Sequence, residues 1–202
     1  RAQFDACFAD FNIVAVKIGM LANAEVVDAV ADALSAHAPS HIVLDPVMIA
    51  KSGDRLIQDD AIDAMRELLI PRATVLTPNL PEAACLLGCA PATTPAQMAE
   101  QGAALRAMGA GAVLMKGGHG DGAICTDLLV TAQGATPFSA RRLSTRNTHG
   151  TGCTLASALA TGLAAGLSIK EAFEQAARFV RIAILSAPGF GQGHGPIGHT
   201  LG

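Results

Sequence analysis

The sequence predicts an α/β fold with a mostly parallel central sheet and helices on both faces. Short runs rich in Val and Ile alternate along the chain with longer segments in which apolar residues recur at helical spacing. The aromatic share is only 3%, with no Trp and no Tyr, so the core must consist of small and aliphatic side chains, as in helices packed on a parallel sheet. The 202 residues contain no evident boundary, repeat or linker, so one domain spanning residues 1–202 is expected.

The first half of the chain alternates strands and helices. Residues 13–18 and 41–44 are predicted strands, and the second of them ends at an Asp-Pro pair. Asn23 is placed to cap a helix between them, and a second amphipathic helix is expected over residues 59–69. A third strand is expected at residues 73–77. The helix positions expected to face the core are Val26, Val27, Val30, Ala31, Leu34, Ile62, Met65, Leu68 and Leu69.

The second half continues the alternation and adds a hairpin. Asn79 is expected to cap one helix, and a Thr-Pro pair begins another over residues 94–108. Residues 112–116 form the next predicted strand, which stops at two glycines. Residues 124–139 are typical of a hairpin around a Gln-Gly turn.

The end of the chain is predicted to hold two helices and an irregular tail. Residues 155–167 are nearly all Ala, Leu, Gly, Ser and Thr, the composition of a helix packed tightly on its neighbours. Ser168 and Glu171 have the spacing of a capping box and begin the last helix. Residues 189–202 are rich in glycine and are expected to be loop-like.

Charge and cysteine content limit the expected partners and compartment. The formal net charge of -3 leaves no basic face, so neither nucleic acid nor an anionic membrane is an expected partner. No apolar run has membrane-spanning length, and no signal peptide is evident. The five cysteines include no C-x-x-C pair, which favours a reducing cytoplasm. Cys85 and Cys89 could clip a metal from one helix, but we expect them to be buried packing residues.

A glycine-rich turn before the helix at residues 155–167 is the first candidate site. Gly150, Thr151 and Gly152 are expected to direct several backbone N–H groups at one place, at the positive end of the helix dipole. Such a turn binds a phosphate or stabilises the charge that develops during phosphoryl transfer. Cys153 lies in the first turn, where the same field favours its thiolate. The alternative is a turn whose glycines only allow close packing of the helix.

Polar residues also follow each predicted strand. Lys17 ends the first strand, Asp45 follows the second, residues 77–82 follow the third and Lys116 ends the fourth. Ligands of open parallel sheets bind beyond the carboxyl ends of the strands. Each residue alone could be a cap or a surface charge, but together with the glycine-rich turn they predict one binding edge.

Five segments in order resemble the bacterial hydroxymethylpyrimidine/phosphomethylpyrimidine kinases of thiamine biosynthesis, a family of the ribokinase-like superfamily. Cys153 closes the glycine turn where most of the superfamily has Asp, which points to the pyrimidine kinases. Residues 193–196 of the tail also resemble the ending of this family. The segments are VKIGML (16–21), LDPVMIAKSG (44–53), LTPNLPEA (76–83), VLMKGGH (113–119) and NTHGTGCT (147–154).

The resemblance implies a ribokinase-like fold and a kinase that depends on ATP and Mg²⁺. Its substrates would be 4-amino-5-hydroxymethyl-2-methylpyrimidine and then the monophosphate, which would become the pyrophosphate. The resemblance also implies a homodimer and an N-terminal portion that this sequence lacks, with a first strand, a helix and strands of the pyrimidine pocket. The chain opens at Arg1 rather than Met, and it could be a fragment with impaired acceptor binding. Because every retained motif is intact, we expect instead that those residues are present in the natural protein.

The phosphate-transfer roles follow from this resemblance and agree with the chemistry of the residues. Gly150, Thr151 and Gly152 would donate backbone N–H groups to the γ-phosphate. Cys153 would contact the substrate hydroxyl and accept its proton, or at least orient that hydroxyl. Lys116 would carry positive charge to the phosphates of ATP.

The remaining candidate residues would hold the metal and the two ligands. Asp45 and Glu82 would bind Mg²⁺, mostly through water. Asn79 would cap its helix and support the metal or a phosphate oxygen, and Gly118 would help to shape the adenine side. Gly19 and Met20 resemble part of the pyrimidine pocket, although a Met after a strand could equally belong to the core.

Two alternatives stay open. A pyridoxal kinase shares the fold, the Mg²⁺ chemistry and the turn of Asn79 and Glu82. A non-catalytic nucleotide- or pyrimidine-binding module would need no proton acceptor beside the anion site. ADP release that depends on the pyrimidine would indicate an enzyme, whereas ligand stabilisation without ADP release would indicate a binding module.

Overall fold

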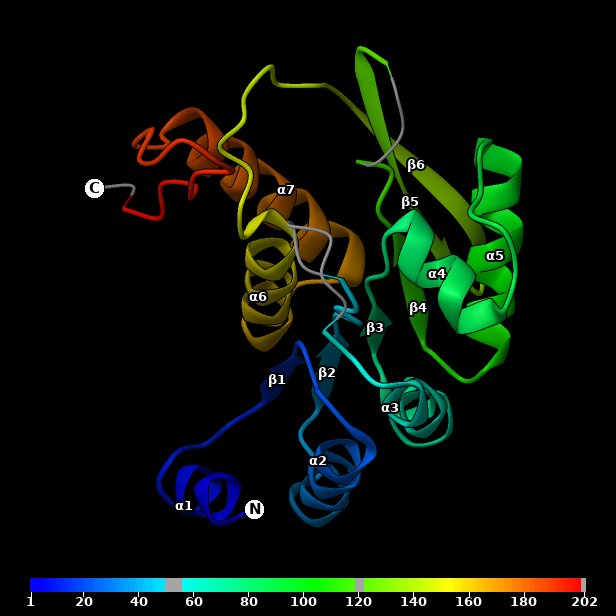
Figure 1. Cartoon of the computed structure of the whole chain (residues 1–202). Helices are drawn as coiled ribbons and strands as arrows, with labels where there is room; N and C mark the ends of the chain where they lie inside the picture. The colour runs from blue at the N-terminus through cyan, green and yellow to red at the C-terminus, as the bar shows by residue number, and fades with distance from the viewer. Residues whose placement is uncertain (50–55, 119–121, 201–202) are drawn as a thin grey trace.

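The computed structural model describes residues 1–49, 56–118 and 122–200, which form one six-stranded sheet flanked by helices (Figure 1). The strands lie in the order in which they occur in the chain. The first four are parallel, and the last two add an antiparallel hairpin to the edge. The α/β prediction is therefore confirmed. The strands are β1 (Ala15–Ile18), β2 (His41–Leu44), β3 (Val75–Leu76), β4 (Ala112–Met115), β5 (Ile124–Thr131) and β6 (Gly134–Arg141).

Helices cover both faces of the sheet, as Figure 1 shows. One face packs against α2 (Ala24–His37), α3 (Asp59–Ala64), α4 (Leu80–Leu87) and α5 (Pro95–Ala107). The other packs against α6 (Thr151–Ala164) and α7 (Ile169–Leu185). The core is aliphatic apart from Phe173 of α7, whose ring meets that of Phe138 edge-on at 4.8 Å.

Successive strand residues point to opposite faces, and this alternation orients the strand ends. Val43 of β2 packs in the α6–α7 layer, whereas Leu44 packs against the α2–α5 layer. Val75 and Leu114 share the layer of Val43. Asp45, Thr77 and Lys116 each follow one of these three residues by two positions, so the polar residues come in phase at the carboxyl edge of the sheet.

The helix caps agree with the sequence. Asn23 Oδ1 accepts a hydrogen bond from the Val26 N–H at 3.0 Å and starts α2. Asn79, Thr94 and Ser168 each form a complete capping box at the start of α4, α5 and α7. Each box satisfies backbone N–H groups that a helix start leaves without partners.

Two local expectations are wrong, and a third holds only in part. The helix predicted over residues 59–69 is present, but it becomes π-helical at Met65–Leu69 and then ends in a 3₁₀ turn, since Pro71 has no N–H to continue the α-helical pattern. Val26 is 40% exposed because it lies on the outer face of α2. Cys85 and Cys89 are both exposed rather than buried. Gly88 ends α4 in the left-handed conformation, with φ 65°, so Cys89 lies beyond the helix.

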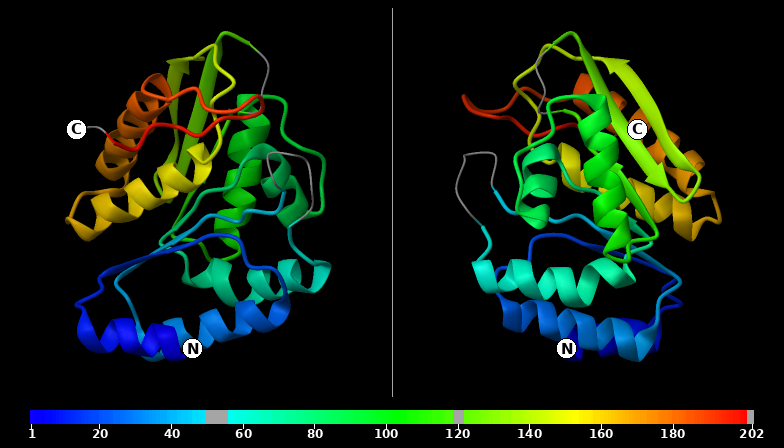
Figure 2. Two further views of the ribbon diagram at one scale, coloured as in Figure 1. Left: turned by 60° about the vertical axis from the view of Figure 1, so that its left-hand side comes forward. Right: turned by 90° about the vertical axis from the view of Figure 1, so that its right-hand side faces the viewer.

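An N-terminal helix, α1 (Ala2–Asp10), has no counterpart in the sequence prediction. It buries no residue, and only Phe4 packs partly against the α2–α5 core layer. Figure 2 shows it alongside α2. Asp5 Oδ1 lies 2.7 Å from His37 Nε2, and Phe8 stacks on the same imidazole at 4.3 Å. Contacts between distant parts of the chain therefore fix this helix.

In the ranges that the structure describes, no helix is both long enough and apolar enough to span a membrane. Those ranges also contain no group of three or more His, Cys, Asp or Glu residues arranged to hold a metal ion. Residues 50–53 and 119 of the motif segments lie outside the described residues.

Candidate active site

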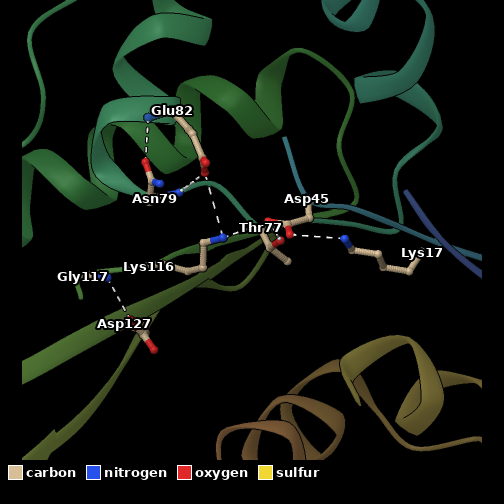
Figure 3. Close-up of polar contacts among 8 residues, drawn as sticks. All are labelled: Lys17, Asp45, Thr77, Asn79, Glu82, Lys116, Gly117 and Asp127. Atoms are coloured by element: carbon tan, nitrogen blue, oxygen red, sulfur yellow. Dashed lines mark hydrogen bonds and ion pairs between the residues drawn. The ribbon is translucent and has the colours of Figure 1, made fainter. Parts of the chain in front are cut away.

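The carboxyl ends of the parallel strands bring four polar side chains together (Figure 3). Lys17 comes from β1, Asp45 follows β2, Thr77 follows β3 and Lys116 follows β4. The expected convergence of polar residues at the carboxyl edge of the sheet is thus present in the structure.

Asp45 is the centre of this group and is only 1% exposed. Its Oδ1 accepts a hydrogen bond from Lys116 Nζ at 2.8 Å and another from the Thr77 hydroxyl at 3.3 Å. Its Oδ2 lies 3.4 Å from Lys17 Nζ. Two ammonium groups therefore compensate one buried carboxylate.

Glu82 takes part both in the helix cap of α4 and in the charged group around Lys116. Its N–H donates to Asn79 Oδ1 at 2.8 Å, while its Oε2 accepts from the Asn79 N–H at 2.7 Å. The same Oε2 lies 3.9 Å from Lys116 Nζ. The Lys116 N–H also donates to the Pro78 carbonyl at 2.9 Å, which fixes the β4 end against the start of α4. The helix cap thereby holds a carboxylate at the binding edge.

Burial and neighbouring charges alter the pKa values of these groups. Burial raises the pKa of Glu82 to about 7, although Lys116 and the Asn79 N–H act in the opposite direction. Burial lowers the pKa of Lys116, but Asp45 and Glu82, together with Cys153, outweigh it and raise that pKa above its ordinary value. Lys116 is therefore a permanent cation at this edge, whereas Glu82 titrates near neutral pH.

The start of α6 completes the site. Gly150 is the N-cap and has φ 88°, a conformation that favours glycine, and among the described residues no side chain caps the first turn. A Cβ on Gly152 would lie 3.4 Å from Lys116 Nζ. The Lys116 ammonium and the positive end of the α6 dipole therefore meet at one point, which suits a phosphate group.

Cys153 is exposed in the first turn of α6 and borders a hollow of about 530 Å³ between α6 and α7. Ser157 lies further along the same wall, and Phe179 and His199 contribute from α7 and the tail. Sequence reasoning missed His199, whose Nε2 lies 2.8 Å from the Thr154 hydroxyl.

The pyrimidine-pocket candidates lie directly after β1. Met20 is 48% exposed, so the core alternative for this residue is wrong. No hydrogen bond or ion pair in the described part of the chain joins Met20 or Gly19 to Cys153 or Lys116. A Cβ on Gly19 would lie 2.7 Å from Lys17 Nζ, so this glycine makes room for the lysine.

One residue near Lys116, Asp127, was missed by the sequence analysis. Asp127 of β5 accepts a hydrogen bond from the Gly117 N–H at 2.8 Å, and burial raises the pKa of Asp127. A Cβ on Gly117 would overlap the Thr126 carbonyl, so only glycine fits there. Gly118, the candidate on the adenine side, is exposed, and its carbonyl accepts from Arg142 Nη1 at 2.9 Å. Alternation along β5 could have indicated Asp127, since Leu129, two residues on, faces α6 and α7.

Comparisons with known proteins agree with this geometry. The family model described as phosphomethylpyrimidine kinase matches residues 1–198. Hydroxymethylpyrimidine/phosphomethylpyrimidine kinases of Salmonella typhimurium and Escherichia coli are 47% and 45% identical, over 98% of this chain and 75% of each relative.

Solved structures show the same fold. An ADP complex of Bacillus subtilis pyridoxal kinase matches with a TM-score of 0.91 and 32% identity, over 99% of this chain and 75% of that one. A phosphomethylpyrimidine kinase from Clostridium difficile matches with a TM-score of 0.79 and 35% identity, over 91% of this chain and 74% of that one. The ribokinase-like expectation is confirmed, and the chain belongs to the phosphomethylpyrimidine kinase family.

Proposed function

We propose that this kinase transfers the γ-phosphoryl group of ATP to the hydroxymethyl group of 4-amino-5-hydroxymethyl-2-methylpyrimidine, and then phosphorylates the monophosphate to the pyrophosphate. The observation that carries the proposal is the meeting of Lys116 with the uncapped start of α6. A fixed cation and a helix N-terminus stabilise the charge that spreads over the phosphoryl oxygens in the transition state.

The proposed transfer assigns a step to each group. The substrate hydroxyl oxygen forms a bond to the γ-phosphorus as the bond from that phosphorus to the bridging oxygen of ADP breaks. The N–H groups of Gly150, Thr151 and Gly152 and the Lys116 ammonium hold the phosphoryl oxygens. Cys153 accepts the proton that leaves the hydroxyl, or orients that hydroxyl for attack.

The donors at the edge fit Mg²⁺, which prefers oxygen ligands. Asp45 Oδ2 is buried and accepts no hydrogen bond from the described residues. The carboxylates of Asp45 and Glu82 both lie next to Lys116 Nζ, at 2.8 Å and 3.9 Å. Asp45 and Glu82 would hold the ion, largely through water, with Asn79 in support. When bound, the ion would neutralise charge on the phosphates.

A pyridoxal kinase is the second candidate, because the Bacillus subtilis enzyme so named matches this fold with a TM-score of 0.91. The higher sequence identity to the pyrimidine kinases supports the first candidate. The proposal also keeps the homodimer, one kinase domain over residues 1–202 and a cytoplasmic location, in which the five free cysteines would stay reduced.

The test is ADP release by the purified protein with Mg-ATP and one of three acceptors: the hydroxymethylpyrimidine, its monophosphate or pyridoxal. Turnover with both pyrimidines and little with pyridoxal is the expected result. A preference for pyridoxal would move the substrate to the second candidate. Ligand-dependent stabilisation without ADP release from any acceptor would indicate a binding module and remove the catalytic roles of Cys153 and Lys116.

A further inference from the structure

Lys17 lies at the same edge as Lys116, and the proposed transfer gives it no step. Its side chain is largely buried, with 18% exposed. It runs over Gly19, where a Cβ would lie only 2.7 Å from the Lys17 Nζ. A side chain at position 19 would therefore press on the ammonium and make it shift.

Lys17 and Lys116 divide the two oxygens of Asp45 between them, as Figure 3 shows. Lys17 Nζ lies 3.4 Å from Oδ2, and Lys116 Nζ lies 2.8 Å from Oδ1. Within the described residues, Asp45 Oδ2 accepts no hydrogen bond, and Lys17 makes no other ion pair. Lys17 is therefore the compensating charge on the Oδ2 side of Asp45.

Lys116, in contrast, lies close to two carboxylates and to the start of α6. Its Nζ lies 2.8 Å from Asp45 and 3.9 Å from Glu82, and it lies beside Gly152 at the start of α6. Phosphates bound at α6 would draw this ammonium away from Asp45. A buried carboxylate that loses its cation is strongly unfavourable, so Asp45 would resist that movement if Lys116 were its only counter-charge.

We propose that Lys17 is a positioning residue that keeps Asp45 neutralised, so that Lys116 is free to bind the phosphates of ATP. The inference rests on the proposed function in one respect, since ATP is taken as the ligand of Lys116. Lys17 acts through Asp45 and needs no contact with either substrate. Gly19 leaves room for the Lys17 ammonium beside this carboxylate.

The experiment is titration calorimetry of the protein with AMP-PCP, a non-hydrolysable ATP analogue, without acceptor and in the presence of a chelator. The chelator removes any effect that passes through a metal ion on Asp45. Lys17→Met is expected to lower the affinity for AMP-PCP by about tenfold, within the usual range of coupling between linked sites. Lys17→Arg should restore most of it, and the exposed Lys170→Met should bind as the wild type does.

A double-mutant comparison separates positioning from direct contact. With Asp45→Asn already present, the buried negative charge is gone, so adding Lys17→Met should change the affinity for AMP-PCP no further. The double variant removes one positive and one negative charge together, so it tests the proposal even if Lys17→Met alone does not fold. A wild-type affinity in Lys17→Met, or an equal loss of affinity in the Asp45→Asn background, would overturn the proposal. This experiment measures nucleotide binding and contains no acceptor. If the protein failed to phosphorylate the pyrimidine in the separate activity assay, that result would count against the proposed function and not against this role of Lys17.

Discussion

Glu82 should make the folding stability fall as the pH rises towards neutrality. Burial raises its pKa from the ordinary value of 4.5 to about 7 in the folded protein. Between these two pH values the folded state binds more protons at Glu82 than the unfolded state does. Its contribution to the free energy of unfolding is therefore fully present below pH 4.5 and is lost as the pH rises through 7.

The magnitude follows from the width of that interval. At about 1.4 kcal/mol for each pH unit, the change from 4.5 to about 7 corresponds to roughly 3 kcal/mol. The side chain is only 7% exposed, so solvent screens little of this effect. Glu82→Gln removes the ionisation but keeps an oxygen that can accept from the Asn79 N–H, so the capping box can remain.

The assay is urea unfolding of the wild type and of Glu82→Gln between pH 4 and pH 8, without divalent cations. The variant should gain about 3 kcal/mol relative to the wild type over this range. Glu171→Gln is the matched control, because Glu171 has the same place in an exposed capping box and hydrogen bonding by Ser168 lowers its pKa. The burial argument would be refuted if the difference in the free energy of unfolding between wild type and Glu82→Gln stayed constant over this pH range. Constant here means within about 0.5 kcal/mol, the usual effect of a surface substitution.

Three further substitutions test the site. Gly117→Ala should destabilise the fold by about 1–3 kcal/mol or more in urea unfolding, because its Cβ overlaps a β5 carbonyl. The neighbouring Gly118→Ala, whose Cβ meets no described residue within 4 Å, should be neutral for stability, and equal effects of the two would contradict the packing argument. Gly152→Ala should raise the KM for ATP, because the added Cβ would lie 3.4 Å from Lys116 Nζ, in the space proposed for a phosphate. It should cost little stability, since residue 152 is helical. An unchanged KM would contradict the placement of a phosphate there. Cys153→Ala should lower kcat by about 10²-fold in steady-state assays, as for loss of a general base, whereas a wild-type kcat would exclude Cys153 from proton transfer.

The gathering of polar residues at the proposed binding edge is predictable from sequence because two simple rules act together. Parallel strands end at the same edge, and alternation brings Asp45, Thr77 and Lys116 into phase there. The cap of Asn79 and Glu82 is also local, because its partners are three residues apart. The sequence therefore contains the identity of these groups and their common location.

The pairing of the charges is not predictable in the same way. Lys17 and Lys116 both follow strands, but only their side-chain directions decide which oxygen of Asp45 each one meets. The raised pKa of Glu82 depends on burial by elements distant in the chain. The exposure of Cys89 depends on Gly88, whose left-handed conformation ends α4 just before the cysteine. Each of these features is set by tertiary packing rather than by residue spacing.

The most direct test of phosphoryl transfer at this edge is mass spectrometry of the pyrimidine product after incubation with Mg-ATP. The wild type should convert the hydroxymethylpyrimidine first to the monophosphate and then to the pyrophosphate. Lys116→Met should form neither product at a comparable rate, while Lys170→Met should form both. A wild type that phosphorylates neither pyrimidine, or a Lys116→Met variant that forms the pyrophosphate as fast as the wild type, would contradict the account.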